Sequence, residues 1–208
     1  SHLIRLFESL IITLFIFNTI GLAARWYIAG HAPWSDAYEA IIFVAWATVI
    51  FGIIFGRKSY FTLASATFVS SIILYVANMN WLDPSIANLQ PVLDSYWLMI
   101  HVAVIVGSYG PFAIGMILGI VTLFLTIIAN KRNQKAFSRK LEELTIVNEL
   151  SLTIGLVMLT IGNFLGGMWA NESWGRYWGW DPKETWALIS IIIYTAVLHL
   201  RIIPKLNN

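Results

Sequence analysis

The sequence contains no cysteine and little charge. Without cysteine, the chain cannot form disulfides, thiolate metal sites or a cysteine nucleophile. Charged residues make up 12% of the 208 residues and hydrophobic residues 58%, and that charged share is about half of what a soluble domain carries. A soluble protein of this size would have too few polar residues to cover its surface, so the apolar excess is expected to face lipid.

Positive charge is equally sparse. The formal net charge is +2, and the basic residues occur in short clusters between apolar runs. A nucleic-acid-binding protein concentrates Lys and Arg on one face, so no nucleic acid partner is expected. The clusters instead indicate how the chain is oriented in a lipid bilayer.

Six apolar stretches are long enough to cross a bilayer core, which takes roughly 20 helical residues. Backbone polar groups must pair internally in lipid, and the runs lack two-residue alternation, so helices are expected rather than a barrel. The predicted fold is an all-α, polytopic integral membrane protein with spans at 8–28, 39–56, 60–79, 96–129, 146–168 and 183–203.

The fourth stretch is longer than one crossing requires. Gly107, Gly110 and Pro111 lie within it, and such residues favour a bend or break in a helix. We therefore expect its first part to lie at the outer surface and the remainder to cross.

The Lys and Arg residues fall unequally on the two sides of these spans. Cytoplasmic loops retain positive charge, which places both termini in the cytoplasm and the loops 29–38, 80–95 and 169–182 outside. The outer side has Arg25, Arg176 and Lys183; the inner side has the other ten, namely Arg5, Arg57, Lys58, Lys131, Arg132, Lys135, Arg139, Lys140, Arg201 and Lys205.

The tryptophans are also unequally distributed. All of the ten except Trp46 fall on the predicted outer side, whereas an ordinary aromatic belt would place them at both interfaces. The densest group lies at 169–186, where large rings alternate with glycines. Rings supply apolar surface and glycines let the backbone approach a flat ligand such as a porphyrin. Its candidate ligand-binding residues are Trp174, Gly175, Arg176, Tyr177, Trp178, Gly179, Trp180 and Asp181.

Two simpler interpretations of this segment remain open. Interfacial Trp and Tyr commonly anchor a protein in the membrane. Asp181, Pro182 and Glu184 also form the pattern of a helix start, with Asp as the N-cap, and this capping role is favoured over direct chemistry for Asp181. Arg176 or Lys183 could pair with the propionates of a porphyrin.

The run Trp174-Gly-Arg-Tyr-Trp-Gly-Trp-Asp181, followed by Pro-Lys-Glu184, resembles the WWD domain of haem-handling proteins in cytochrome c maturation. Gly30-His-Ala-Pro-Trp-Ser-Asp-Ala-Tyr-Glu39 and Leu93-Asp-Ser-Tyr-Trp-Leu-Met-Ile-His-Val102 are similar to the CcsA (ResC) branch of system II. The resemblance covers most of residues 30–201. It implies that residues 1–208 are a single CcsA-like transmembrane domain, incomplete at its C-terminus or part of a fused CcsBA.

The resemblance also implies a function. Such a protein handles haem b and delivers it for covalent attachment to apocytochrome c on the outer side of the membrane, as a component of a cytochrome c synthase (haem lyase). The implied partners are a CcsB/ResB-like membrane protein, an apocytochrome c with a Cys-X-X-Cys-His motif, and the lipid bilayer. The favoured location is the bacterial inner (plasma) membrane rather than the thylakoid, and this piece alone is expected to bind haem weakly.

The four histidines have different expected roles. By resemblance, His101 is an outer axial ligand of haem iron and His199 a membrane-embedded ligand near the inner face, their second ligands lying downstream and in the partner. The alternatives are an interfacial polar residue for His101 and a residue snorkelling beside Arg201 for His199. His31 is expected to be structural, and His2 carries no weight because the first residues could be a tag remnant.

Three other functions remain open at this point. A haem exporter or chaperone would bind haem without synthase activity. A b-type electron-transfer subunit would need paired histidines within its spans. A purely structural membrane anchor would bind no haem.

Overall fold

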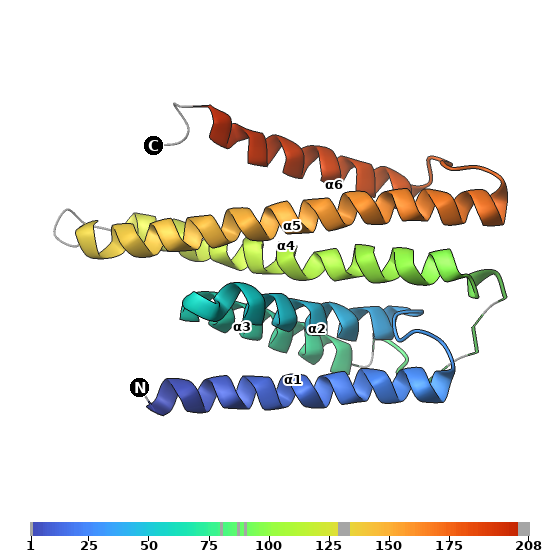
Figure 1. Ribbon diagram of the computed structural model, residues 1–208, viewed down its shortest axis with the longest axis horizontal. Coiled ribbons are helices and arrows are strands. Elements are labelled where there is room, and N and C mark those ends of the chain that lie inside the picture. Colours follow the sequence, from blue (N-terminus) through green and yellow to red (C-terminus); the bar gives the residue numbers. More distant parts are fainter. Residues whose placement is uncertain (1, 80, 87, 90, 129–133, 204–208) are drawn as a thin grey trace.

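The computed structural model describes residues 2–79, 81–86, 88, 89, 91–128 and 134–203, without the side chains of Lys58, Val92 and 134–137. Six helices in this part are long and apolar enough to cross a membrane, and no strand occurs among the described residues, which confirms the all-α, polytopic fold. The elements (Figure 1) are α1 (His2–Ala29), α2 (Ala37–Phe55), η1 (Gly56–Lys58), α3 (Tyr60–Asn78), η2 (Pro91–Leu93), α4 (Tyr96–Ile128), α5 (Gln134–Trp174), α6 (Pro182–His199) and η3 (Leu200–Ile202).

The start of α1 and the end of η3 lie at one end of the helical bundle, opposite the loop between α5 and α6 (Figure 1). Which end faces the cytoplasm remains a prediction. Of the basic residues used for it, Lys131, Arg132 and Lys205 lie outside the described residues, as do the side chains of Lys58 and Lys135. The described Arg5, Arg57 and Arg201 lie on α1, η1 and η3, at the end that carries the termini.

Helix α4 is continuous, so a break at Gly107–Pro111 is wrong, while the position of its first part at the outer surface stays a prediction. The helix has 33 residues with Pro111 inside it. Proline removes one backbone hydrogen bond, but here it is fully buried, as are the small residues Gly107, Ser108 and Gly110 before it. A Cβ on Gly110 would lie 2.8 Å from the backbone carbon of Ala47 in α2. The close packing of α4 against α2 therefore helps to offset the backbone hydrogen bond that Pro111 removes.

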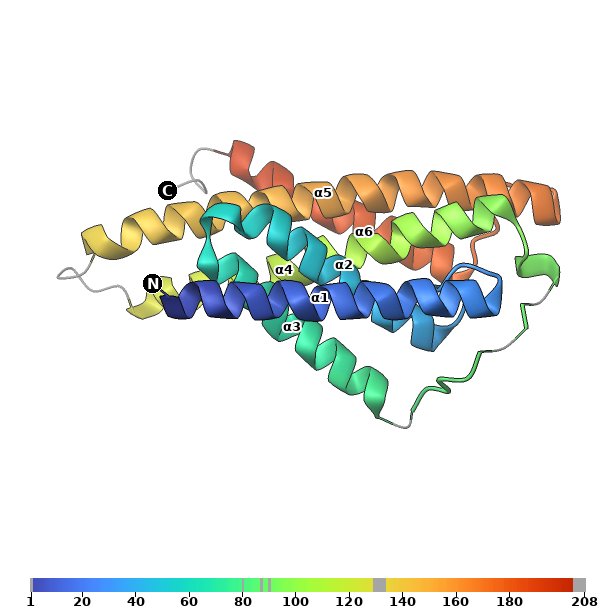
Figure 2. The same cartoon turned by 60° about the horizontal axis from the view of Figure 1, so that its bottom comes forward.

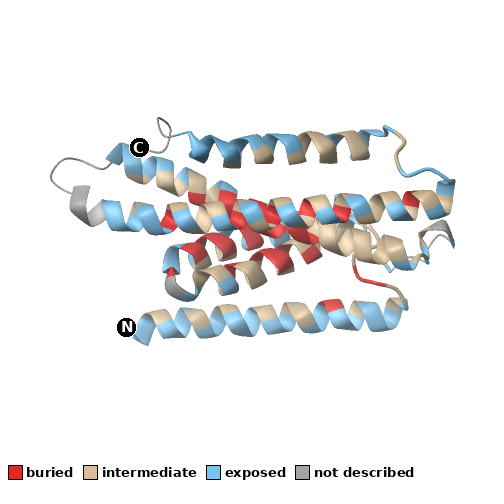
Figure 3. Cartoon of the chain, turned by 45° about the horizontal axis from the view of Figure 1, so that its top comes forward, coloured by how far each residue is buried: buried red, intermediate tan, exposed pale blue. Residues whose placement is uncertain are grey.

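The core lies between α2, α3, α4 and α5. Ala66, Ile114, Leu118 and Leu144 form a buried cluster there. By contrast, Leu22 is the one buried residue of α1, and α6 has none among its described residues (Figure 3). Helix α5 has 41 residues, about 60 Å of helix, and extends well past the predicted span 146–168.

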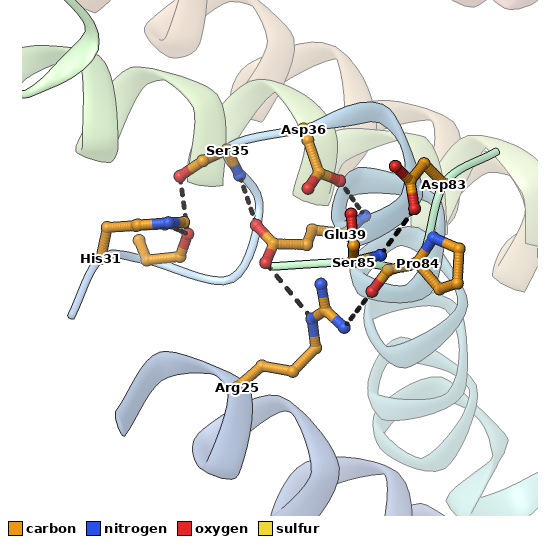
Figure 4. A network of polar contacts seen from close by, with 9 residues as sticks. Arg25, His31, Ser35, Asp36, Glu39, Asp83, Pro84 and Ser85 are labelled. Carbon is orange, nitrogen blue, oxygen red and sulfur yellow. Dashed lines mark hydrogen bonds and ion pairs between the residues drawn. The ribbon is translucent and has the colours of Figure 1, made fainter. Parts of the chain in front are cut away.

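Helix α3 inclines away from the bundle, and its connection to α4 passes the end of α1 (Figure 2). A buried ion pair holds this connection in place (Figure 4). Arg25 Nε lies 3.2 Å from Glu39 Oε1, and Arg25 Nη1 donates to the carbonyl of Pro84 at 3.0 Å. The Glu39 side chain is fully buried and also accepts from the Ser35 backbone N–H at 3.0 Å. Three segments are thus tied together by one carboxylate and one guanidinium.

Replacing Arg25 with Met is expected to destabilise the protein by about 3–5 kcal/mol, because it leaves the buried Glu39 carboxylate without its counter-charge. Thermal unfolding in detergent measures the loss. The matched control is Arg201→Met, since Arg201 and its partner Glu149 are both largely exposed and such pairs contribute little. Equal destabilisation by the two variants would contradict this account.

Candidate functional site

A cavity of about 620 Å³ opens between α4, α5, α6 and the loop that joins α5 to α6. This size is within the range of small-molecule and cofactor sites. Most of its lining is apolar or aromatic, and the other polar side chains come from α4 (His101), α5 (Asn163), the end of the loop (Asp181) and α6 (Lys183, Glu184 and Ser190). The lining residues are His101, Ile105, Tyr109, Phe112, Leu159, Asn163, Gly166, Gly167, Trp169, Ala170, Tyr177, Trp178, Asp181, Pro182, Lys183, Glu184, Trp186, Ala187, Ser190 and Tyr194.

His101 is held by α5 in a defined orientation. Its Nδ1 lies 2.7 Å from the carbonyl oxygen of Gly162. A carbonyl can only accept a hydrogen bond, so Nδ1 carries the proton in the neutral ring, and the lone pair is left on Nε2. This is how proteins commonly prepare an imidazole as a metal ligand, with the second nitrogen fixed by a hydrogen bond.

Two glycines of α5 let α4 pack closely beside His101, and the sequence reasoning missed both: Gly166 makes room for the His101 ring, and Gly162 makes room for Ile105. A Cβ on Gly166 would lie 2.5 Å from Cε1 of His101, and a Cβ on Gly162 would lie 2.4 Å from Ile105. The signal was present as Gly162-Asn-Phe-Leu-Gly166, the small-residue spacing that lets membrane helices approach closely. Here Gly166 of this motif also leaves space for the imidazole ring of His101.

The tryptophan-rich segment is shorter as a loop than predicted. Residues 169–174 are the last turn of α5, and residues 182–186 the first turn of α6, which leaves 175–181 as the loop. The helix continues through Trp174 because neither glycine nor proline occurs between Gly167 and Gly175, and Gly175 has φ +69° and donates to the Asn171 carbonyl. A left-handed glycine is a common helix end. Trp180 has φ +57°, a strained conformation for a residue with a large side chain.

The end of the loop is fixed by a capping box, which confirms the predicted helix start. The Asp181 carboxylate accepts from the Glu184 backbone N–H at 2.9 Å. In return, Glu184 Oε2 accepts from the N–H of Asp181 at 3.4 Å and of Gly179 at 2.7 Å. One glutamate therefore holds the last three residues of the loop against the start of α6.

Replacing Asp181 with Ala is expected to cost about 1 kcal/mol, as for other lost N-caps, and to lower the thermal midpoint. Asp181→Asn is the matched variant, because its amide oxygen still accepts from Glu184. We expect thermal unfolding of the Asn variant to resemble that of the unsubstituted protein. If Asn destabilised as much as Ala, the carboxylate charge rather than the cap would be responsible.

The structure brings together only part of the predicted site. His101, Tyr177, Trp178 and Asp181 all line the cavity. Trp178 and Trp180 meet edge to face with centroids 5.7 Å apart, yet Trp180 itself is 70% exposed and is not part of the lining. The other predicted residues outside the lining are Trp174, Gly175, Arg176, Gly179 and His199.

Arg176 and Gly179 form a contact of their own. A Cβ on Gly179 would lie 2.5 Å from Nη1 of Arg176, so the guanidinium lies over this glycine. The basic residue that does line the cavity is Lys183, which is exposed at its mouth.

The other two histidines considered above, His199 and His31, do not line the cavity. His199 is the last residue of α6, about 25 Å along the helix from its start, where its Nδ1 lies 2.7 Å from the Thr195 carbonyl. The exposed ring is followed by η3, whose Arg201 pairs with Glu149 of α5. His31 lies in the loop before α2, with Nδ1 3.3 Å from the Ala32 carbonyl. The cavity therefore contains a single imidazole, that of His101.

A stacked aromatic pair, which the sequence reasoning missed, lines the cavity. The rings of Phe112 and Tyr194 are 4.1 Å apart with an interplanar angle of 17°. Both residues also line a second groove of about 400 Å³, whose other residues are apolar: Gly115, Met116, Gly119, Ile120, Leu123 and Leu152. Residues distant in sequence, on α4 and α6, form this pair, which is why periodicity alone could not reveal it.

The cavity suits a flat, largely apolar ligand that brings most of its own metal ligands. Among the described residues, no three His, Cys, Asp or Glu side chains cluster to hold a bare metal ion. Two indole N–H groups, of Trp169 and Trp178, are buried without a hydrogen-bond partner in the described part of the chain. Such groups are costly unless an acceptor reaches them. With Lys183 at the mouth, they could hold the acidic groups of a ligand whose metal His101 coordinates.

Comparison with known proteins gives consistent matches over the whole chain. Residues 34–208 match the family model described as cytochrome C assembly protein. Protein NrfI of Wolinella succinogenes is 46% identical over 99% of this chain. The cytochrome c biogenesis proteins CcsA of Prochlorococcus marinus and of Guillardia theta are 34% and 37% identical over 90% and 88% of it. The chain spans 23% of the Wolinella protein and 69% and 68% of these two CcsA proteins.

Proposed function

Because the chain belongs to the cytochrome c assembly protein family, we propose that it holds haem b in the cavity at His101 and presents it for covalent attachment to apocytochrome c. Haem is a substrate in this scheme, and its iron would bind Nε2 of His101. The observation that carries the proposal is the orientation of His101. Its Nδ1 is engaged by Gly162, and its ring faces a cavity bordered by the tryptophan-rich segment.

The lining supports a porphyrin in two ways. Tyr177, Trp178 and Trp186 supply aromatic surface with few rotamers to immobilise, which suits a flat macrocycle. The unpartnered indole N–H groups of Trp169 and Trp178 and the ammonium of Lys183 offer donors for the propionates. Trp174, Trp180 and Arg176 lie outside this cavity, and we propose that they form the surface on which an apocytochrome approaches.

The chain would act by positioning. A thioether forms when a cysteine S–H of the Cys-X-X-Cys-His motif adds across a haem vinyl group, so that the new bonds are S–C and C–H and no oxidant is needed. The reactivity belongs to the haem, while a fixed imidazole and a fixed aromatic wall raise the effective concentration of the reacting groups. We propose that the chain does this as a component of a cytochrome c synthase with a CcsB/ResB-like partner, in the bacterial plasma membrane.

His199 would be a second, separate haem contact at the other end of α6, completed by the partner. His199 lies about 25 Å along α6 from the start of the helix and is not in the lining of the cavity that contains His101, so we propose that the two histidines contact haem at separate positions. A b-type electron-transfer subunit is disfavoured, because the described cavity contains one imidazole rather than a facing pair. A haem exporter or chaperone would use the same cavity, and the experiment below separates it from a synthase component.

The proposal is tested by expressing the full-length protein with its CcsB/ResB-like partner in bacteria whose own cytochrome c maturation genes are deleted. An apocytochrome with a Cys-X-X-Cys-His motif is the reporter. We expect the purified assembly to carry haem, seen in its visible spectrum, and the reporter to stain for covalent haem after denaturing electrophoresis. A coloured assembly without covalent haem on the reporter would indicate an exporter or chaperone. A colourless assembly would refute haem handling.

A further inference from the structure

We propose that Trp34 is a positioning residue for His101, and that the segment Gly30–Glu39 is folded to hold it in place. The proposal rests on the proposed haem site, because His101 matters only as the ligand of that site. The segment contributes no residue to the cavity lining, although it stands out in the sequence. Its contacts lead instead to the first turns of α4, which carry His101.

One hydrogen bond links Trp34 to the start of α4, the helix that carries His101. The indole N–H of Trp34 donates to the carbonyl oxygen of Met99 at 3.0 Å. Met99 lies two residues before His101, in the first turns of α4. This bond gives a carbonyl of α4 a donor from outside the helix, and it joins the loop before α2 to the N-terminal part of α4. A donor fixed outside the helix thereby fixes the turn from which His101 projects.

Trp34 is itself immobilised by other rings. Its centroid lies 4.7 Å from that of Phe43 and 5.5 Å from that of Trp26, the latter in an edge-to-face arrangement. Aromatic pairs at these distances stabilise one orientation of each ring. The indole N–H therefore has little freedom to leave the Met99 carbonyl.

The loop that carries Trp34 is held by the buried ion pair (Figure 4). The residue after Trp34 is Ser35, whose backbone N–H donates to Glu39 Oε2 and whose hydroxyl donates to the Ala32 carbonyl at 2.7 Å. Glu39 is bound in turn by Arg25. The buried Glu39 carboxylate, which is bound through both of its oxygens, makes the segment rigid. The segment is thereby fixed to α1 through Arg25 and Glu39, and to α4 through Trp34 and Met99.

On its other side, the same part of α4 meets the glycines of α5. The His101 ring has the Gly162 carbonyl as its acceptor, and Gly166 leaves no spare room beside it. The turn is thus held between Trp34 on one side and α5 on the other. Loss of the Trp34 bond would let the turn shift, which would loosen the bond that sets the tautomer of His101.

The test compares Trp34→Phe with Trp46→Phe in the full-length assembly with its partner. Trp46 is the matched control, because its indole N–H also makes one hydrogen bond, at 2.9 Å, but to Thr19 Oγ1 of α1 rather than to α4. One readout is the rate at which diethyl pyrocarbonate modifies His101 in haem-free protein, followed by mass spectrometry. The other is the dissociation constant and visible spectrum of bound haem.

We expect Trp34→Phe to speed the modification of His101 several-fold and to weaken haem binding about tenfold, the lower end of effects of residues that orient a metal ligand, with an altered spectrum. Trp46→Phe should match the unsubstituted protein in both readouts. If the two variants behave alike, Trp34 does not position His101. If Trp34→Phe cannot be recovered folded, Glu39→Gln, which releases Arg25 and the loop, is expected to change the same two readouts, and unchanged values would overturn the proposal.

The two proposals can fail separately. An unsubstituted assembly that binds no haem refutes the proposed function, while the modification rate of His101 still decides whether Trp34 positions it. An assembly that binds haem with the same affinity in both tryptophan variants leaves the proposed function standing and refutes the role of Trp34.

Discussion

The His101→Ala variant of the complete assembly is expected to lose its haem and to form almost no covalent cytochrome c. Residues that merely orient a metal ligand change affinity 10-fold to 100-fold, so loss of the ligand itself should lower haem content by at least about tenfold. Haem content per purified protein and covalent haem on a coexpressed reporter are the measurements. The helix should persist, because alanine has the highest helix propensity.

The control for this variant is His31→Gln. His31 lies in the loop before α2, and its ring is not part of the cavity lining, so haem content should stay near that of the unsubstituted assembly. Added imidazole should partly restore the spectrum of His101→Gly by entering the space of the lost ring. Full haem content in His101→Ala would rule out the proposed ligand role.

The Gly166→Ala variant is expected to have nearly as large an effect, although it adds a single methyl group. That methyl carbon would lie 2.5 Å from Cε1 of His101 and 2.8 Å from Nδ1, closer than atoms can approach. The imidazole must move, which breaks its bond to Gly162 and displaces Nε2 from the cavity. Overpacking of this kind costs about 1–3 kcal/mol, and haem binding should fall about tenfold or more as the orientation of the ligand is lost.

Gly21→Ala is the matched control, because Gly21 also lies within a membrane helix and a Cβ there would meet nothing within 4 Å. We expect this variant to be as stable as the unsubstituted protein or slightly more so, since alanine favours helix over glycine. Haem titration of the two variants side by side separates a local displacement of His101 from a general effect of added methyl groups. Equal haem affinity in both variants would contradict the proposal that the absence of a side chain at Gly166 sets the position of the His101 ring.

Much of the fold could be predicted from the sequence because lipid imposes simple rules. Each apolar run must form a helix of a set minimum length, and the six runs correspond to six helices. The N-cap at Asp181 is a local pattern and was likewise predictable. These features depend on composition and on neighbours within a few residues.

Other features depend on contacts between distant residues and were missed. Pro111 suggested a break in the fourth span, but tight packing of Gly110 against Ala47 in α2 supports an unbroken helix. The extent of the tryptophan-rich loop was overestimated, since its first residues complete α5. In α4, packing against α2 outweighed the tendency of proline to break a helix. In α5, no residue that ends a helix occurs between Gly167 and Gly175, so the helix continues into the tryptophan-rich segment.

The candidate site was predicted in part. His101 and Trp178 share one cavity, as the motifs indicated, whereas Trp174 and Trp180 are turned to the surface. The direction of a side chain in a loop depends on backbone angles, such as the positive φ of Trp180, which composition does not specify. The hydrogen bond between Trp34 and Met99 joins segments 65 residues apart, and no local pattern encodes it.

Pulsed electron paramagnetic resonance tests most directly whether Nε2 of His101 binds the iron. The His101→Gly assembly is produced with ¹⁵N-labelled histidine, and its ferric haem is then supplied with imidazole of natural ¹⁴N abundance. We predict that a ¹⁴N axial ligand, absent from the fully labelled unsubstituted assembly, appears in the variant together with restored haem content. Axial nitrogens that remain entirely ¹⁵N, with haem content unchanged by the substitution, would contradict the account.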